Sequence, residues 1–154
     1  MSQGVQRGSR LFSIGAFAVI LEHAHVLLCH RRDMDAWDLP GGGVESRELP
    51  TEAVVREVQE ETGLQVVVEQ LVGVYGRAEK DASVFVFLCR ATGGQLAITD
   101  EADALEYFPL GHLPVNINPR QVERIQDALH PEAGPVFRRQ SGASTREWLA
   151  GLHI

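Results

Sequence analysis

The sequence predicts one α/β domain in which a mixed β-sheet lies between helices. Short apolar runs rich in valine, leucine and phenylalanine are typical of buried strands. Two other stretches begin with a proline that suits the first turn of a helix. The length of 154 residues fits a single domain. We expect its core over residues 12–130 and a C-terminal tail over residues 131–154, whose role the sequence leaves open.

The first part of the predicted sheet is a pair of strands. Residues 12–21 and 25–30 are apolar runs separated by a turn at residues 22–24. A loop over residues 31–36 follows, and it leads to three glycines at 41–43. Because glycine permits backbone conformations that other residues avoid, we expect a loop that turns sharply and approaches the next segment closely.

A helix is predicted from Pro50 to Thr62. The proline lacks the backbone N–H that a first turn does not need, Glu52 places an acid near the positive helix end, and Gly63 suits a left-handed stop. At about 100° per residue the side chains fall on three faces. One face packs (Val54, Val55, Val58), one binds (Glu57, Glu60, Glu61) and one meets solvent (Glu52, Arg56, Gln59).

The second half of the chain predicts more strands and a second helix. A valine-rich run that alternates poorly is expected to be a buried strand that ends near Gly73 and Gly76. Asn118 and Pro119 supply an N-cap and a first-turn proline. The expected segments are strands over 64–74, 83–89 and 104–108, a helix from 118 to about 129, and a short helix over 145–149.

The three glutamates of the first helix are the main chemical signal. Glu57, Glu60 and Glu61 lie three and four residues apart or side by side. Like charges at these spacings destabilise a helix by about 0.2–0.5 kcal/mol per pair. A hard divalent cation can offset this repulsion because it takes carboxylate oxygens as ligands. The sequence therefore predicts a metal site on this helix.

The spacing of these residues continues upstream. Gly42 is followed after five residues by Glu48, and after seven more by the run REVQEETGL at residues 56–64. This pattern matches the Nudix box at every fixed position, so the chain resembles the Nudix hydrolases, with a looser resemblance over about residues 12–129. The resemblance implies an α/β/α sandwich with a mixed sheet, and it implies hydrolysis of a diphosphate linkage.

The resemblance also implies residue roles. Glu57, Glu60 and Glu61 match positions that bind Mg²⁺ or Mn²⁺, Glu57 could also help to activate water, and Gly42 matches the loop glycine beside them. Arg56 matches an arginine that braces the box by pairing with an acid, which we expect to be Glu48. Many relatives recruit another glutamate as a base or metal ligand. Glu101 is our candidate, with three rivals: Asp100, Asp103 and Glu106.

Substrate contacts are expected at Gly41, Gly42, Arg31 and Trp37. Arg31 and its neighbour Arg32 could instead form a solvated strand end, and Trp37 could pack the glycine loop in place. Other residues invite simpler interpretations, namely core packing for Cys29 and Cys89, surface positions for His23 and His25, and sheet-edge packing or a cleft position for Tyr107 and Phe108.

The resulting hypothesis is metal-dependent hydrolysis of a nucleoside diphosphate linked to another moiety, such as a sugar nucleotide or an ADP-ribose-like compound. Two alternatives stay open. One is cleavage of (d)NTPs or dinucleoside polyphosphates, and the other is a non-catalytic module that binds a nucleotide. Residues 79–83 hold neither the proline nor the tyrosine that some ADP-ribose-cleaving and dinucleoside-polyphosphate-cleaving relatives carry there.

Composition narrows the partners. A formal net charge of −7 argues against a general nucleic-acid binder. The apolar run at 14–21 is too short to span a bilayer, and no positive segment with a long apolar run precedes it. We therefore expect a cytoplasmic protein with a small-molecule substrate and no membrane partner. A homodimer contact through the C-terminal tail is a further option.

Overall fold

The structure is a computed structural model that describes residues 11–77 and 79–152. The N-terminal residues 1–10, part of the stretch in which the sequence holds no positive segment followed by a long apolar run, lie outside the described residues. In the described part of the chain, no helix is both long enough and apolar enough to cross a membrane.

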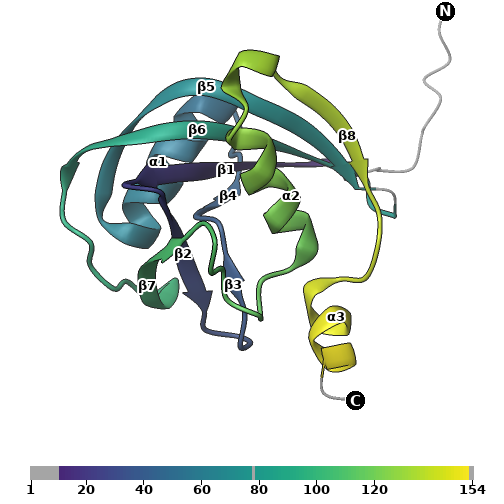
Figure 1. Cartoon of the computed structure of the whole chain (residues 1–154). Helices are drawn as coiled ribbons and strands as arrows, with labels where there is room; N and C mark the ends of the chain where they lie inside the picture. The colour runs from purple at the N-terminus through teal and green to yellow at the C-terminus, as the bar shows by residue number, and fades with distance from the viewer. Residues whose placement is uncertain (1–10, 78, 153–154) are drawn as a thin grey trace, which may run out of the picture.

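Eight strands of the described residues form one mixed sheet (Figure 1). They are β1 (Ser13–Glu22), β2 (His25–Arg31), β3 (Trp37–Asp38), β4 (Gly41–Gly43), β5 (Leu64–Arg77), β6 (Ala82–Gly94), β7 (Ala102–Pro109) and β8 (Val136–Gln140). The helices are α1 (Pro50–Thr62), α2 (Pro119–Ala128), the 3-10 turn η1 (Pro131–Ala133) and α3 (Thr145–Leu152).

The strand order is β3-β2-β1-β6-β5-β8, with β4 paired to β1 and β7 paired to β2. The pairs β1–β6 and β5–β8 are parallel, and the other pairs are antiparallel. The strands β1 and β2 are joined by His23 and Ala24, which have φ values of 48° and 59°. A two-residue turn with two positive φ values matches the twist of a hairpin, so the turn lies where the sequence predicted it.

Helices α1 and α2 cover opposite faces of the sheet (Figure 1). Successive residues of a strand point to opposite faces, so Ala18 of β1 packs with α1 while Val19 packs on the α2 side. Val54 and Val58 of α1 are fully buried, and Ile125 of α2 is almost so. The prediction of an α/β/α sandwich with a mixed sheet is confirmed.

The glycine segment is where the local prediction was wrong. Gly41–Gly43 is a short strand rather than a loop, and it pairs antiparallel with β1. Its partners in β1 are Gly15, Ala16 and Phe17. The segment is therefore held by ladder hydrogen bonds, which fixes its position under α1.

The end of β5 also differs from the prediction. The strand does not stop near Gly73 but continues to Arg77, because β8 pairs with it in parallel from Gly73 onwards. A Cβ atom on Gly73 would lie 2.7 Å from the backbone oxygen of Val136. The glycine thus permits a close strand approach. Strand β8 itself was not predicted, and it carries the sheet beyond residue 130.

Candidate active site

Helix α1 begins and ends as the sequence predicted. Glu52 accepts a hydrogen bond from the backbone N–H of Leu49 at 2.9 Å, which satisfies a donor at the helix start. Gly63 has a φ of 82°, and its N–H donates to the carbonyl of Gln59 at 2.9 Å. The valine face packs on the sheet, so the carboxylates on the adjoining face are held in a fixed orientation.

Three carboxylates meet at this face. Glu57, Glu60 and Glu101 each place a carboxylate oxygen within 4.8 Å of the others. Glu101 comes from the segment before β7, far along the chain from α1. Of the four acids considered for this role, only Glu101 lies in this group of described residues. Asp103 instead contacts Nδ1 of His30 at 2.6 Å.

Arg32 and Thr99 position the segment that carries Glu101. The guanidinium of Arg32 donates to the carbonyls of Thr99 at 2.8 Å and Ala102 at 3.3 Å, on either side of Glu101. The Thr99 hydroxyl donates to the carbonyl of Glu61 at 3.3 Å. Arg32 is exposed, as expected of a solvated strand end, and its guanidinium also bonds to the carbonyls of Thr99 and Ala102. Backbone carbonyls distant in sequence leave no pattern from which this contact could be predicted.

Arg56 braces the acidic face. It donates two hydrogen bonds to the Glu48 carboxylate, at 2.7 and 2.9 Å, which is the pairing that the resemblance implied. It also donates to Glu57 at 3.0 Å, to Glu60 at 3.1 Å and to the Gly43 carbonyl at 3.0 Å. Arg56 therefore does not lie on a solvent-facing side as its helical angle suggested, because four carboxylate and carbonyl partners draw it inward.

The three glutamates of α1 do not share one environment. Glu61 accepts a hydrogen bond from the N–H of Gly41 at 3.0 Å and lies beside the buried thiol of Cys29. The pKa of Glu61 is raised to about 7, mainly by burial and in smaller part by the nearby Glu101 and Glu57, while the hydrogen bonds from Gly41 and Cys29 oppose the shift. Burial also raises the pKa of Glu57. Ionising both groups is costly without a compensating positive charge.

Gly42 makes room for this cluster because it has no side chain. A Cβ atom at Gly42 would lie 2.5 Å from the carboxyl carbon of Glu57. The glycine therefore leaves the space that Glu57 occupies. The placement of Gly42 in a metal site stays a prediction.

The residues present fit a hard divalent cation. The donors are carboxylate oxygens, which suit Mg²⁺ and Mn²⁺ better than softer metals. Two of them are held by Arg56, and burial raises the pKa of Glu57 and Glu61, so a bound cation would stabilise their ionised forms. Glu57, Glu60 and Glu101 would be ligands, with Glu61 adjoining them.

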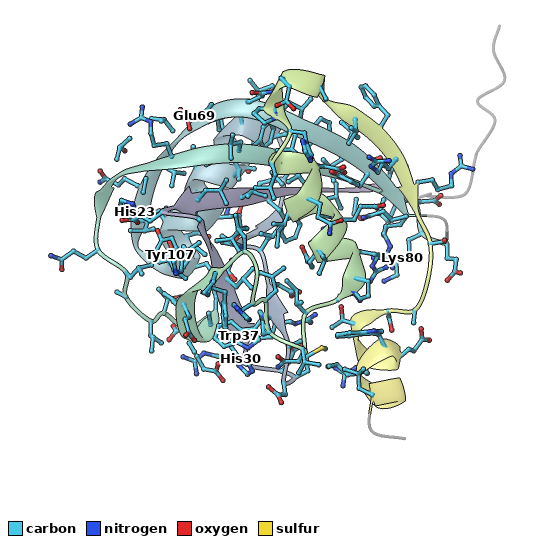
Figure 2. All side chains as sticks on the ribbon, in the orientation of Figure 1. His23, His30, Trp37, Glu69, Lys80 and Tyr107 are labelled. Carbon is cyan, nitrogen blue, oxygen red and sulfur yellow. The ribbon has the colours of Figure 1, made fainter. Side chains whose placement is uncertain are left out.

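The predicted substrate contacts have other neighbours in the structure. The Trp37 ring packs edge-on against His30 at 5.0 Å and Phe108 at 4.8 Å between ring centroids, so packing accounts for its position. Figure 2 shows Trp37 and His30 together at the β2–β3 end. Arg31 donates to Asp33 at 2.8 and 2.9 Å and also lines a cavity on the α2 side. Cys29 is buried, as expected.

The NUDIX domain family model matches residues 11–128 of this chain. The chain belongs to the Nudix family. Together with relatives that are named as pyrophosphatases, this match identifies it as a Nudix pyrophosphohydrolase. Four of the five charged residues at fixed positions of the box, Glu48, Arg56, Glu57 and Glu60, form one bonded group in the structure.

Three relatives show the range of substrates named among similar Nudix proteins. A Bacillus subtilis protein provisionally named 8-oxo-dGTP diphosphatase is 37% identical over 119 residues, which cover 76% of this chain and 80% of that protein. A crystal structure of an ADP-ribose pyrophosphatase from Streptococcus suis is 26% identical, covers 84% of this chain and 100% of that one, and has a TM-score of 0.72. A crystal structure of a UDP-X diphosphatase is 27% identical, covers 83% of this chain and 67% of that one, and also has a TM-score of 0.72.

Proposed function

We propose that this Nudix enzyme hydrolyses the diphosphate linkage of a nucleoside diphosphate joined to another moiety, such as a sugar nucleotide or an ADP-ribose-like compound, with Mg²⁺ or Mn²⁺ as its cofactor. The observation that carries the proposal is the convergence of Glu57, Glu60 and Glu101 within 4.8 Å. The names of two similar solved structures, an ADP-ribose pyrophosphatase and a UDP-X diphosphatase, support this substrate class.

The residues of the chain have separable tasks in this reaction. A divalent cation bound at the cluster would supply charge compensation for the diphosphate oxygens and would lower the pKa of a water. Arg56 holds Glu57 and Glu60 in place through hydrogen bonds of 3.0 and 3.1 Å. Glu101, which is exposed and held by its loop, is our candidate for the group that accepts the proton of the attacking water, with Glu57 as the alternative.

The chemical change is a simple hydrolysis. The water oxygen bonds to one phosphorus, the bridging P–O bond breaks, and the bridging oxygen leaves with the other phosphorus. One proton of the water goes to the accepting carboxylate and is later released. The products are two fragments that each carry a phosphate group.

A second candidate function is cleavage of (d)NTPs. The similarity to the Bacillus subtilis protein, at 37% identity over 76% of this chain, favours it. The two functions use the same cluster and differ in the substrate moiety. A binding module without activity is the third option, and the bonded, intact box argues against it.

The test is a substrate panel of nucleotide sugars, ADP-ribose, dinucleoside polyphosphates and (d)NTPs with Mg²⁺ in oxygen-18 water. Product masses then identify both the substrate and the attacked phosphorus. Glu60→Gln is expected to lower kcat/KM about 100-fold or more, because even the loss of groups behind a metal ligand costs about 10–100-fold. The matched control is Glu69→Gln, an exposed glutamate of β5 that pairs with Arg90 (Figure 2).

Each result has a defined meaning. Hydrolysis that is lost in Glu60→Gln and kept in Glu69→Gln supports the proposal. Full activity in Glu60→Gln would show that the cluster is not the site. Nucleotide binding by the wild type without turnover of any compound on the panel would replace the proposal with the binding module.

A further inference from the structure

A pocket lined by arginines lies on the α2 face of the sheet. Its inner part is a cavity of about 200 Å³, and a neighbouring hollow of about 340 Å³ shares several of its lining residues. We call it the arginine pocket, lined by Arg31, Arg77, Arg120, Arg124, Asp38 and Thr145. The outer hollow adds Lys80 and Arg146. Figure 2 shows Lys80 on the side where the N-terminal end of α2 and α3 lie.

The positive charges of this pocket are poorly balanced. Arg31 bonds to Asp33 and lies 3.6 Å from Asp38, but Arg124 donates two hydrogen bonds to the neutral side chain of Gln140. Among residues 11–77 and 79–152, the side chains of Arg77 and Arg120 form neither a salt bridge nor a hydrogen bond. The lining of the pocket thus holds four guanidinium groups and one carboxylate, that of Asp38, in a protein of net charge −7.

Arg120 carries a buried hydrogen-bond donor that lacks an acceptor. Its Nη1 atom is buried and has no hydrogen-bond partner in the described structure. A buried polar group without a partner is costly, and a charged one more so. Burial and the nearby Arg77 lower the pKa of Arg120, and burial and the nearby Arg120 lower the pKa of Arg124 to about 10. The arginines therefore repel one another across the cavity.

The pocket and the acidic cluster are connected by a short piece of backbone. Phe17 lines the pocket and lies opposite Gly41 in the β1–β4 pair. The N–H of Gly41 in turn donates to Glu61 at 3.0 Å. Asp38 of the pocket is three residues before Gly41. The pocket and the acidic cluster therefore adjoin the same backbone segment, residues 38–41.

We propose that the arginine pocket binds an anionic group, a phosphate or a carboxylate, on the moiety that is joined to the nucleoside diphosphate. This inference rests on the proposed function and narrows its substrate class to compounds with a second negative group separate from the cleaved diphosphate. A planar guanidinium donates two parallel hydrogen bonds to either group, and such charge-assisted bonds are the stronger kind. A bound anion would give Arg120 its partner and would remove the repulsion among the arginines.

Matched substrate pairs test the inference. UDP-glucuronate is compared with UDP-glucose for the carboxylate, and ADP-ribose 1″-phosphate, whose extra phosphate is on the terminal ribose, is compared with ADP-ribose for the phosphate. We expect kcat/KM of the wild type to be about tenfold or more higher for the anionic member of at least one pair, which corresponds to one good charged contact. Arg120→Gln and Arg77→Gln should each lower this ratio towards one. Arg90→Gln, an exposed arginine of β6 that pairs with Glu69, is the charge-matched control and should keep the ratio.

A second measurement does not depend on catalysis. Metal-free protein in EDTA is titrated with inorganic phosphate at constant ionic strength, and the phosphate-induced rise in melting temperature is compared among variants. The rise should be smaller in Arg120→Gln and Arg77→Gln than in the wild type and Arg90→Gln. Comparing the rise, rather than the melting temperature itself, removes any effect of the substitution on basal stability.

The outcomes separate the two proposals. Equal kcat/KM for both members of both pairs, with no difference in phosphate response among the variants, would overturn the arginine pocket and leave the hydrolysis intact. A phosphate response that requires Arg120 in a protein that hydrolyses no compound would support anion binding at the pocket while removing the proposed function. If the double variant Arg120→Gln, Arg77→Gln kept the higher kcat/KM for the anionic substrate, the proposal for the arginine pocket would also be wrong.

Discussion

Glu48 and Glu61 show how neighbouring groups give two carboxylates of one motif opposite properties. Hydrogen bonds from Arg56 hold the pKa of Glu48 down at about 2, so this side chain stays ionised and anchors the arginine. Burial raises the pKa of Glu61 to about 7 although the Gly41 N–H opposes that shift. The sequence shows four similar glutamates. Only their surroundings distinguish Glu48, which anchors Arg56, from Glu61, whose ionised form is destabilised by burial.

The raised pKa of Glu61 predicts that metal-free protein loses stability as pH rises from about 4.5 to about 7. In this window the unfolded chain has lost the Glu61 proton while the folded protein retains it, so deprotonation favours unfolding. Urea unfolding in EDTA at several pH values measures the effect. Glu61→Gln should flatten the slope because it removes the titrating group.

A divalent cation, like Glu61→Gln, should weaken the pH dependence of stability. With excess Mg²⁺ the fall in wild-type stability across this pH window should shrink, because the cation compensates the ionised carboxylates. Glu69→Gln is the control and should retain the metal-free slope. An unchanged slope in Glu61→Gln would show that other groups, such as His30, cause the pH dependence.

At the scale of elements, the contact between β4 and α1 determines the shape of the acidic face. Strand β4 is held by pairing with β1, and α1 is held by its valines, so the distance between Gly42 and Glu57 is set by both. The neighbouring Gly43 differs, since a Cβ atom there would meet nothing within 4 Å. A side chain would therefore collide with Glu57 at Gly42, whereas the neighbouring Gly43 has room for one.

Gly42→Ala should lower kcat/KM strongly while changing stability little. The added methyl group meets the end of a flexible side chain, so Glu57 can move away, but it then leaves the cluster. Gly43→Ala is the matched control and should retain activity. Steady-state kinetics with Mg²⁺ and melting temperatures check both variants. Equal activity in the two variants would contradict the role that we assign to Gly42.

The elements that could be predicted are those with local signals. Helix α1 has a proline and a valine face within its 13 residues and a glycine directly after them, and β1 and β2 are apolar runs around a tight turn. The strands β4 and β8 could not be predicted, because three glycines and the short run 136–140 carry no period. They become strands only because β1 and β5 present edges to them.

On the scale of the whole molecule, the C-terminal strand is tied to the sheet and to α2. Gln140 is 3% exposed and accepts hydrogen bonds from Arg124 at 3.1 and 2.9 Å. Its amide donates to the Arg120 carbonyl at 3.1 Å and to Glu123 at 2.9 Å. Arg138 of the same strand donates twice to Asp127. Strand β8 thus supports the helix that carries two arginines of the pocket.

Gln140→Ala should lower the free energy of unfolding by about 1–3 kcal/mol, because the buried guanidinium of Arg124 then loses its acceptor. Gln126→Ala, an exposed glutamine on α2, is the control and should change it by less than about 0.5 kcal/mol. Urea denaturation measures both. Equal small effects would mean that β8 is only loosely attached, contrary to the hydrogen bonds described above.

The sequence by itself determined the box helix, the glutamates on its binding face, the pairing partner of Arg56 and the α/β class, because each depends on spacing within a short segment or on a family pattern. Only the tertiary structure decided that Glu101, rather than Asp103 or its neighbours, joins Glu57 and Glu60. It alone decided that arginines from β2, β5 and α2 meet in one pocket. Such meetings depend on which strands pair and which faces pack, and residues far apart in the chain leave no local pattern that records them.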